Sequence, residues 1–279
     1  MDKNKYFTIT DGLAVFGPEI IQILNKLDAI FVDMSKDFMA DNMIFPALMK
    51  VEDLSSLDYF NNFPHLGLAV AGLTDEACGC LTSQKEKVTT IRQNNIKDSD
   101  YLLPSAACYN VYLHLRNEVV TQAKYYTTAA RCFRNESEYK GLERLWSFQM
   151  REIICIGSMD EVQAFLSVYK NKISSLAEQI GIVFDIEVAT DPFYDKQGTK
   201  ALMQKLQPVK EEFVFEGTVS AASLNFHRNF FGEKCNILNN TGAAVFSGCV
   251  AFGLERWLHA LLKTYGHDLE TIHGKLNNV

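Results

Sequence analysis

Two arginines, two glutamates and an aromatic ring that could bind a phosphorylated ligand lie close together in the sequence: Arg134, Glu136, Arg144, Phe148 and Glu152. The pattern predicts one strand over residues 125–136 and a second over residues 146–156, joined by a short loop. An arginine side chain can fork onto two phosphate oxygens. The combination suits a site that binds ATP and activates a carboxylate, although Arg134 and Glu136 fit a surface ion pair equally well.

Glu152 is an unusual residue for its place in the second predicted strand. Side chains alternate between the two faces of a strand, so Glu152 shares a face with an apolar set: Phe148, Met150, Ile154 and Ile156. A carboxylate on an apolar face is costly unless it has a partner. Two interpretations remain open: an ion pair with an arginine near the strand end, or a ligand for a metal ion or a substrate ammonium group.

The cysteines could also take part in chemistry, and there are seven of them: Cys78, Cys80, Cys108, Cys132, Cys155, Cys235 and Cys249. None forms a pair with a two-residue spacer, so spacing alone gives little support for zinc. Cys108 precedes a predicted helix, whose dipole favours a thiolate, but a lone cysteine is more often a small buried hydrophobe. The six histidines are dispersed, and none pairs obviously with a serine or cysteine nucleophile.

A second candidate segment, residues 247–257, runs from a predicted strand through Gly253 into a helix that carries Arg256. Glycine would let a flat ligand approach the backbone; the alternative is close helix–sheet packing with Arg256 in solvent. The spacing matches neither of the two glycine patterns that cradle phosphate groups. Residues 225–228, which begin with Asn225, are polar enough to line a pocket or to lie on the surface.

Composition limits the class of protein. The chain has 279 residues, is 47% hydrophobic, and carries a net charge of -7 with a pI near 5.4. Its basic residues are scattered, which argues against a large nucleic-acid-binding face. The sequence begins with polar residues and contains no apolar run long enough to span a membrane. We therefore expect a cytoplasmic protein with free or metal-bound thiols.

The elements that would position these residues are predicted by periodicity. A helix begins at Pro18 and extends to about Phe38, and a capping box, Ser158 with Glu161, opens another that Gly181 ends. Further strands are expected at residues 43–45, 182–189, 212–226 and 243–248, helices at 111–119 and 254–265, and a loop-rich excursion at 74–100. With no repeat or linker, residues 1–279 are expected to form one α+β domain with a mainly antiparallel sheet.

Taken together, these segments resemble the catalytic core of class II aminoacyl-tRNA synthetases, most closely the seryl type. Residues 132–136 resemble the Phe-Arg-x-Glu of the second motif, with residues 141–144 and Phe148 matching its loop and returning strand. Residues 253–256 resemble the third motif. Phe45-Pro46 resembles the first motif, which lies at the dimer interface in that family, and residues 102–106 resemble the segment that carries the amino-acid-binding loop. The resemblance spans roughly residues 20–265. It implies an antiparallel sheet flanked by helices, and a homodimer.

Two departures narrow the resemblance. Seryl enzymes carry a long N-terminal helical arm that binds tRNA, whereas here the first motif begins almost at once, so no such arm is expected. The chain is also acidic. Both features favour the amino acid:(carrier protein) ligases, which resemble zinc-dependent archaeal seryl enzymes. That resemblance implies a zinc site at Cys108, Glu152 and Cys249, whose open fourth position takes the substrate amine.

The resemblance also implies a reaction. ATP, with Mg²⁺, would activate glycine or alanine as an adenylate, and the phosphopantetheine thiol of a carrier protein would then accept the amino acid. The amine must bind zinc unprotonated, so substrate affinity should fall at low pH. An acidic ligase and an acidic carrier repel, so docking would need a local basic or apolar patch.

Roles follow residue by residue from the same resemblance. The catalytic arginines would be Arg134, which holds the α-phosphate, and Arg256, which with Phe148 sandwiches the adenine and reaches the terminal phosphates. Glu136 would read the adenine amino group, and Arg144 is a further phosphate ligand. The remaining candidates are Ser105, Ala106 and Asn225 for the amino acid, and Glu211, Glu212 and Glu216 for Mg²⁺, with Ser223 nearby.

Two other functions remain open. A synthetase-like protein could aminoacylate tRNA or a protein lysine, which parallel transfer assays would reveal. A catalytically silent paralogue could act as a binding subunit. Silent paralogues usually lose the motif arginines, but Arg134 and Arg256 are both present.

Overall fold

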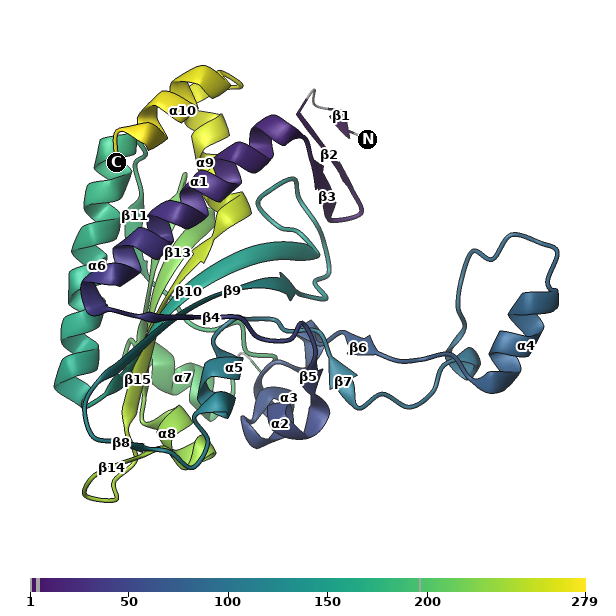
Figure 1. Ribbon diagram of the computed structural model, residues 1–279, viewed down its shortest axis with the longest axis horizontal. Helices are drawn as coiled ribbons and strands as arrows, with labels where there is room; N and C mark the ends of the chain where they lie inside the picture. Colours follow the sequence, from purple (N-terminus) through teal and green to yellow (C-terminus); the bar gives the residue numbers. More distant parts are fainter. Residues whose placement is uncertain (1, 4–5, 196) are drawn as a thin grey trace.

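A seven-stranded sheet forms the centre of the computed structural model, which describes residues 2–3, 6–195 and 197–279 (Figure 1). Its strands, in order across the sheet, are β11 (Asp185–Val188), β12 (Lys210–Phe215), β13 (Val219–Arg228), β15 (Phe246–Gly253), β10 (Ser147–Gly157), β9 (Lys124–Phe133) and β4 (Asp41–Met43). Every neighbouring pair is antiparallel except β4 with β9. The predicted α+β class with a mainly antiparallel sheet is confirmed.

Four helices cover one face of this sheet: α1 (Pro18–Ser35), α6 (Met159–Ile180), α9 (Leu254–Tyr265) and α10 (Leu269–Asn277) (Figure 1). The apolar stripe of α1 is buried as its spacing predicts, and its Phe31 ring stacks on Phe252 of β15 at 4.1 Å. The Arg151 guanidinium on β10 donates to both carboxylate oxygens of Asp28 at 2.8 Å. This ion pair fixes α1 against the strand that carries Glu152.

The opposite face is covered by shorter elements that surround a cavity. A second hydrophobic cluster includes Tyr112 of α5 (Tyr109–His114), whose ring stacks at 3.8 Å on Phe231 of α8 (Phe230–Cys235). Nearby elements are α2 (Val51–Ser56), α3 (Tyr59–Asn62), η2 (Pro64–Leu66), α7 (Thr199–Leu206) and the small sheet of β5 (Met49–Lys50), β6 (Ala69–Val70) and β7 (Tyr101–Leu102).

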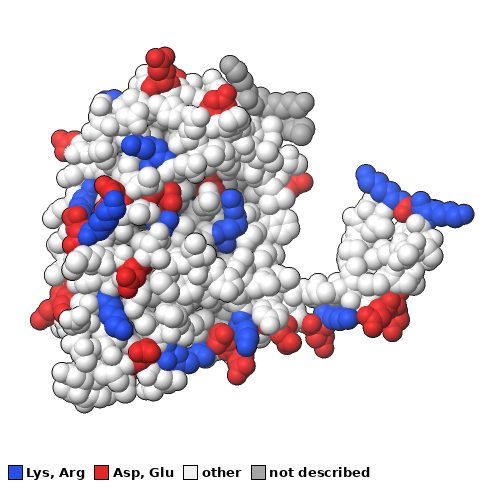
Figure 2. Space-filling view, in the orientation of Figure 1, with Lys and Arg blue, Asp and Glu red and all other residues white. Residues whose placement is uncertain are grey.

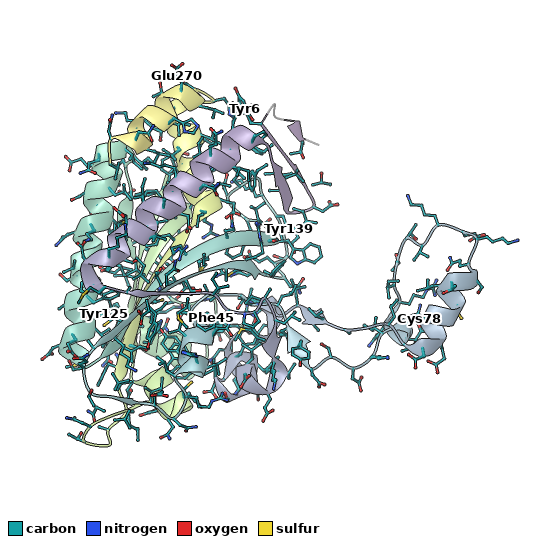
Figure 3. All side chains as sticks on the ribbon, viewed as in Figure 1. Tyr6, Phe45, Cys78, Tyr125, Tyr139 and Glu270 are labelled. Atoms are coloured by element: carbon teal, nitrogen blue, oxygen red, sulfur yellow. The ribbon has the colours of Figure 1, made fainter. Side chains whose placement is uncertain are left out.

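Peripheral elements complete the chain: β1 (Asp2–Lys3), β2 (Phe7–Thr10), β3 (Leu13–Phe16), η1 (Lys36–Phe38), α4 (Asp75–Ser83), η3 (Gln93–Asn95), β8 (Val119–Val120) and β14 (Leu238–Asn239). Helix α4 stands on an arm that projects from the body, and Cys78 lies on it, far from the sheet (Figures 1 and 3). Acidic and basic side chains are interspersed over the face in Figure 2. No helix of the described residues is long and apolar enough to cross a membrane.

Several predicted boundaries are wrong for reasons of strand pairing. The strand expected at residues 43–45 is β4, two residues earlier, because its backbone pairs with β9, and Ile44 is 92% exposed. The strand expected at 212–226 is two strands, β12 and β13, since Glu216 and Gly217 take positive φ angles and reverse the chain. The strand expected at 243–248 starts at residue 246 and continues to Gly253.

Two other segments differ from expectation. The strand predicted over residues 125–136 is β9, which ends at Phe133, because the N–H of Asn135 donates to Leu66 O instead of to a neighbouring strand. Arg134 and Glu136 therefore lie beyond the strand rather than on one of its faces. The excursion at residues 74–100 contains α4, which is capped because Thr74 Oγ1 accepts a hydrogen bond from the N–H of Ala77.

Helix α6 forms with both predicted caps. Ser158 Oγ accepts from the N–H of Glu161 at 3.3 Å, Glu161 Oε2 accepts from the N–H of Ser158 at 2.8 Å, and Gly181 takes φ = 72°. We expect Ser158→Ala to lower the free energy of unfolding by about 1 kcal/mol, because both hydrogen bonds of the Ser158 hydroxyl to Glu161 are lost. Urea unfolding would measure it. Ser174→Ala on the same helix is the control, and equal losses in both variants would contradict the cap assignment.

Candidate functional site

Cys108, Glu152 and Cys249 come together on the face of the sheet opposite the long helices. One ligand atom from each lies within 4.8 Å of the other two, and all three side chains are buried. Glu152 on β10 and Cys249 on β15 are placed by the ladder that pairs Ile154 with Cys249, and Cys108 stands at the start of α5. Two thiols and a carboxylate in one buried cluster form a donor set that suits a zinc ion.

The carboxylate of Glu152 is held by backbone rather than by an arginine. Its Oε1 accepts hydrogen bonds from the N–H of Ala107 at 2.8 Å and of Cys108 at 3.3 Å. Arg151, its neighbour, points to the other face and pairs with Asp28. The ion-pair interpretation of Glu152 is therefore wrong, and the ligand interpretation keeps its support.

The helix at Cys108 does not by itself produce a thiolate. A hydrogen bond with Cys249, burial, and the Glu152 carboxylate raise the pKa of Cys108 well above that of a free thiol. Helix α5 has six residues, so its dipole is weak against these effects. A bound dication would reverse the balance, because a coordinating thiol is deprotonated.

Polar residues of β13 stand beside Cys249. The Asn225 amide Nδ2 donates to Cys249 Sγ at 3.4 Å and to Ser223 Oγ at 3.0 Å. The His227 ring places Nε2 at 3.7 Å from the same sulfur and Nδ1 at 3.1 Å from the Tyr112 hydroxyl. Burial lowers the pKa of His227 to about 4, so its imidazole is neutral at physiological pH.

The cysteine–glutamate cluster opens into a cavity of about 470 Å³. Three residues expected to bind an amino acid, Ser105, Ala106 and Asn225, line it. So do seven aromatic rings: Tyr59, Phe63, Tyr109, Phe193, Phe226, Phe230 and Phe231. The hydroxyl of Tyr59 is buried, and the Phe63 ring stacks on Phe193 at 5.3 Å. The cavity is thus an apolar chamber with a polar cluster on one wall.

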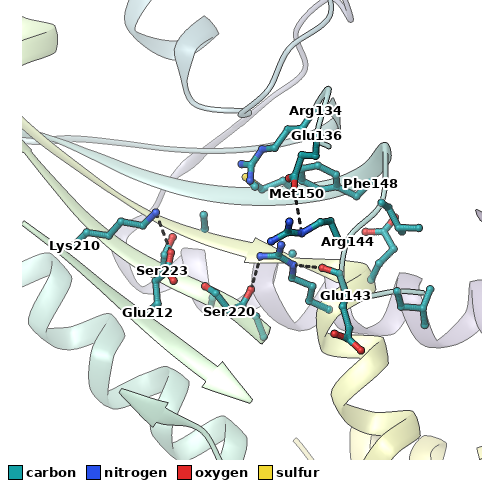
Figure 4. Close-up of a pocket in the computed structure, with 18 residues that line it drawn as sticks. Arg134, Glu136, Glu143, Arg144, Phe148, Met150, Lys210, Glu212, Ser220 and Ser223 are labelled. Atoms are coloured by element: carbon teal, nitrogen blue, oxygen red, sulfur yellow. Dashed lines mark hydrogen bonds and ion pairs between the residues drawn. The ribbon is translucent and has the colours of Figure 1, made fainter. Parts of the chain in front are cut away.

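A second, narrower pocket of about 80 Å³ contains the arginines (Figure 4). All five residues expected to bind ATP line it: Arg134, Glu136, Arg144, Phe148 and Arg256. The Arg134 guanidinium lies over the Phe148 ring, with its carbon 5.1 Å from the ring centre, and Arg144 Nε lies 3.1 Å from Glu136 Oε2. These contacts must open to admit a nucleotide.

One interpretation of residues 247–257 placed Arg256 in solvent, and that interpretation is wrong. Its Nε donates to Glu143 O and its Nη1 donates to Ser220 O, both at 2.9 Å. Burial and the nearby Arg134 lower the pKa of Arg256 to about 10, so it remains a cation at neutral pH. A cation held by carbonyl groups in a pocket is suited to an anionic ligand.

The two pockets meet at residues that line both: Arg134, Met150, Lys210, Ser223 and Ala251. Sequence reasoning missed Lys210. Its Nζ lies 2.9 Å from Glu212 Oε1 and 3.3 Å from Asp191 Oδ1. Burial alone would lower the pKa of Lys210, but the two carboxylates outweigh it and raise that pKa. Lys210 and Glu212 alternate along one strand and so share a face, which could have pointed to the lysine. The predicted strand began at residue 212 and therefore left Lys210 out.

The candidate Mg²⁺ ligands are separated by the fold. Glu212 lines the arginine pocket and pairs across the ladder with Ser223, which lines both pockets. Glu211 instead forms a 2.7 Å ion pair with Lys170 of α6, and Glu216 lies in the exposed turn between β12 and β13. Glu211 and Glu216 are therefore wrong candidates, because they lie outside the pocket.

Comparison with known proteins agrees with this geometry. A family model described as the class II tRNA synthetase core domain (G, H, P, S and T) matches residues 88–265. Amino acid–(acyl-carrier-protein) ligase 1 of Bradyrhizobium diazoefficiens is 32% identical over all of this chain and 87% of its own length. Ligase 2 of the same organism is 31% identical over 88% of this chain and 76% of its own.

More distant relatives share the fold. The type-2 serine–tRNA ligase of Methanocaldococcus jannaschii is 24% identical over 94% of this chain. The SerRS of M. kandleri, solved with an A. aeolicus tRNASec, superposes with a TM-score of 0.83 at 21% identity over 97% of this chain. The chain spans 54% of the first and 57% of the second, about half of their length.

Proposed function

The chain belongs to the amino acid–(acyl-carrier-protein) ligases, which are built on the class II synthetase core, and we propose that it joins glycine or alanine to the phosphopantetheine thiol of a carrier protein at the expense of ATP. The observation that carries the proposal is the meeting of two pockets. One contains arginines suited to phosphate, and the other contains the Cys108–Glu152–Cys249 cluster. Arg134 and Lys210 stand where they join.

Cys108, Glu152 and Cys249 would hold Zn²⁺, and the donor set supports this because it supplies two sulfurs and an oxygen within reach of one point. When bound, the metal would supply an open position for the neutral amine of the substrate. The hydrogen bonds from Ala107 and Cys108 to Glu152 fix that carboxylate before any ligand arrives. Ser105 and Ala106, beside the cluster, would then contact the amino acid.

In the first step the substrate carboxylate attacks the α-phosphorus of ATP, a new P–O bond forms, and pyrophosphate leaves. Arg134 would bind the α-phosphate, and Phe148 with Arg256 would enclose the adenine. Glu136 would accept from the adenine amino group once Arg144 leaves it for a phosphate. Glu212 is the candidate ligand that would hold Mg²⁺, which would supply positive charge to compensate the phosphates. This step needs positioning and charge compensation more than covalent help from the protein.

In the second step the carrier thiol attacks the activated carbonyl, a thioester forms, and AMP leaves. The cavity of about 470 Å³ is far larger than glycine or alanine, which leaves room for a thiol arm beside the amino acid. We further propose a single catalytic domain over residues 1–279, without tRNA as a partner. Exposed Met39 and Ile44 near the first motif support a homodimer, and seven free cysteines support a cytoplasmic location.

Pyrophosphate exchange with a panel of amino acids tests the activation step. We expect exchange with glycine or alanine, and no exchange with any amino acid would overturn the proposal. Labelled amino acid is then offered to holo-carrier, apo-carrier and tRNA in parallel. Transfer to the holo-carrier alone supports the assignment. Transfer to tRNA or to protein lysines would favour the synthetase-like alternative, and complete inactivity the silent paralogue.

Lys210 has a testable place in the first step. Carboxylate and phosphate are both anionic, so a cation where the pockets join reduces their repulsion. We expect Lys210→Met to lower kcat for exchange by roughly tenfold to a hundredfold, because it removes this cation and the ion pairs that it forms with Asp191 and Glu212. The matched control is Lys170→Met, since Lys170 pairs with Glu211 of the same strand on the outer side. Equal kcat for both variants would exclude the role, and Lys210→Arg should recover part of the rate.

A further inference from the structure

The two cysteines of the cluster have different surroundings. Cys249 lies beside two side chains of β13 that can bring N–H groups to its sulfur, Asn225 Nδ2 at 3.4 Å and His227 Nε2 at 3.7 Å. Strand β13 pairs Asn225 directly with Cys249, and its register shifts between Phe226 and Arg228, where His227 reaches the same sulfur. Cys108, at the start of α5, contacts Cys249 and Glu152 instead.

The orientation of the His227 ring is fixed from behind. Its Nδ1 lies 3.1 Å from the Tyr112 hydroxyl and 3.4 Å from Ser247 Oγ, so the opposite nitrogen faces Cys249. Phe231 meets the imidazole edge-on at 5.0 Å between ring centres and stacks on Tyr112 at 3.8 Å. The ring is therefore held by a packed aromatic pair as well as by its hydrogen bonds.

The hydrogen-bonding roles follow from the state of the sulfur. A metal-bound cysteine is a thiolate and has no proton to donate, so a favourable contact requires N–H on the facing nitrogen. His227 then donates through Nε2, and its Nδ1 accepts from the Tyr112 hydroxyl. Asn225 supplies the second N–H. Two such donors draw charge from the sulfur and hold it in one place.

We propose that Asn225 and His227 are positioning residues that hold Cys249 as a metal ligand through two N–H···S hydrogen bonds, with Tyr112 fixing the imidazole. The inference rests on the proposed metal site and deepens it. It gives Asn225 a different task from the substrate contact expected from the sequence. Because groups that orient a metal ligand set its geometry and donor strength, they act on the metal before any substrate is present.

The test compares His227→Met, which keeps a similar volume without N–H, with His227→Gln, which retains an N–H donor. Zinc affinity is measured by competition with a chromophoric chelator, and the cobalt(II)-loaded proteins are compared by their thiolate-to-cobalt absorption. We expect His227→Met to weaken metal affinity by about 10- to 100-fold and to shift that absorption, and His227→Gln to retain most of both. Asn225→Leu should shift the absorption in the same direction.

The other outcomes would overturn either the positioning role or the metal site itself. If His227→Met and Asn225→Leu bind metal as the parent does, with unchanged absorption, the positioning role is overturned while the metal site stands. If the parent binds no metal, or if Cys249→Ala binds it fully, the metal site itself is overturned. Circular dichroism shows whether a variant has unfolded. If His227→Gln binds metal well and His227→Met does not, the difference comes from the N–H donor and not from loss of the imidazole ring as a packing element.

Discussion

Cys249→Ala is expected to abolish stoichiometric zinc binding and, with it, amino-acid-dependent pyrophosphate exchange. The cluster offers three protein ligands, and Cys249 is the one that touches both Cys108 and the β13 donors. Two remaining ligands hold zinc poorly. Zinc affinity should therefore fall by more than the roughly 100-fold that follows the loss of a residue hydrogen-bonded to a ligand. Elemental analysis of purified protein and the exchange rate measure the two effects.

The matched control is Cys155→Ala. Cys155 is equally buried and lies on β10, but it belongs to the cluster under the long helices, on the opposite face from Glu152. This variant loses core volume without losing a ligand, so it should keep its zinc. Full metal in Cys249→Ala, or metal loss in both variants, would contradict the ligand set.

Arg134→Ala is expected to give the second large effect, a fall in kcat/KM for pyrophosphate exchange of about 10²- to 10³-fold. Arg134 lies at the junction of both pockets and donates through Nε to Ser105 O at 3.2 Å. It is therefore oriented before ATP binds. Charge stabilisation by an oriented donor is lost in full when the side chain is removed.

Two further variants separate charge from geometry. Arg134→Lys keeps the charge without the planar fork, so it should recover only part of the activity. Arg116→Ala removes a half-exposed arginine that pairs with Asp53 on the surface, and should leave exchange unchanged. An Arg134→Ala enzyme with parental kcat/KM would rule out contact between Arg134 and the reacting phosphate.

The parts of the fold that follow from local rules could be predicted from the sequence. Both ends of α6 were found because the Ser158 cap and Gly181 each act within a few residues. The predicted helix at residues 254–265 matches the bounds of α9, Leu254–Tyr265. Glu152 was identified as out of place by alternation alone, and the structure explains it through the backbone N–H groups that hold it.

The rest depends on contacts between distant parts of the chain. Cys108 and Cys249 are far apart in sequence, so spacing could not place them together, and only the family resemblance did. The bounds of β4 and β15 depend on their strand partners. His227 and Lys210 could be assigned to the site only from the fold, because β13 and β12 place them beside the cavities. Helix α4 was missed because it is short and has no apolar stripe, since Ala77 is its one buried residue, and the signal at its start is a single threonine, Thr74.

One short segment, residues 104–108, touches both halves of the site. Pro104 O accepts from the N–H of Phe133, Ser105 O accepts from Arg134, and the N–H groups of Ala107 and Cys108 donate to Glu152. We therefore expect a movement of this segment to displace Arg134 and the cysteine–glutamate cluster together. By thermodynamic linkage, if a ligand bound on one side changes the affinity on the other by some factor, the second ligand changes the affinity for the first by the same factor. We therefore expect amino acid and ATP affinities to be coupled through these five consecutive residues of backbone.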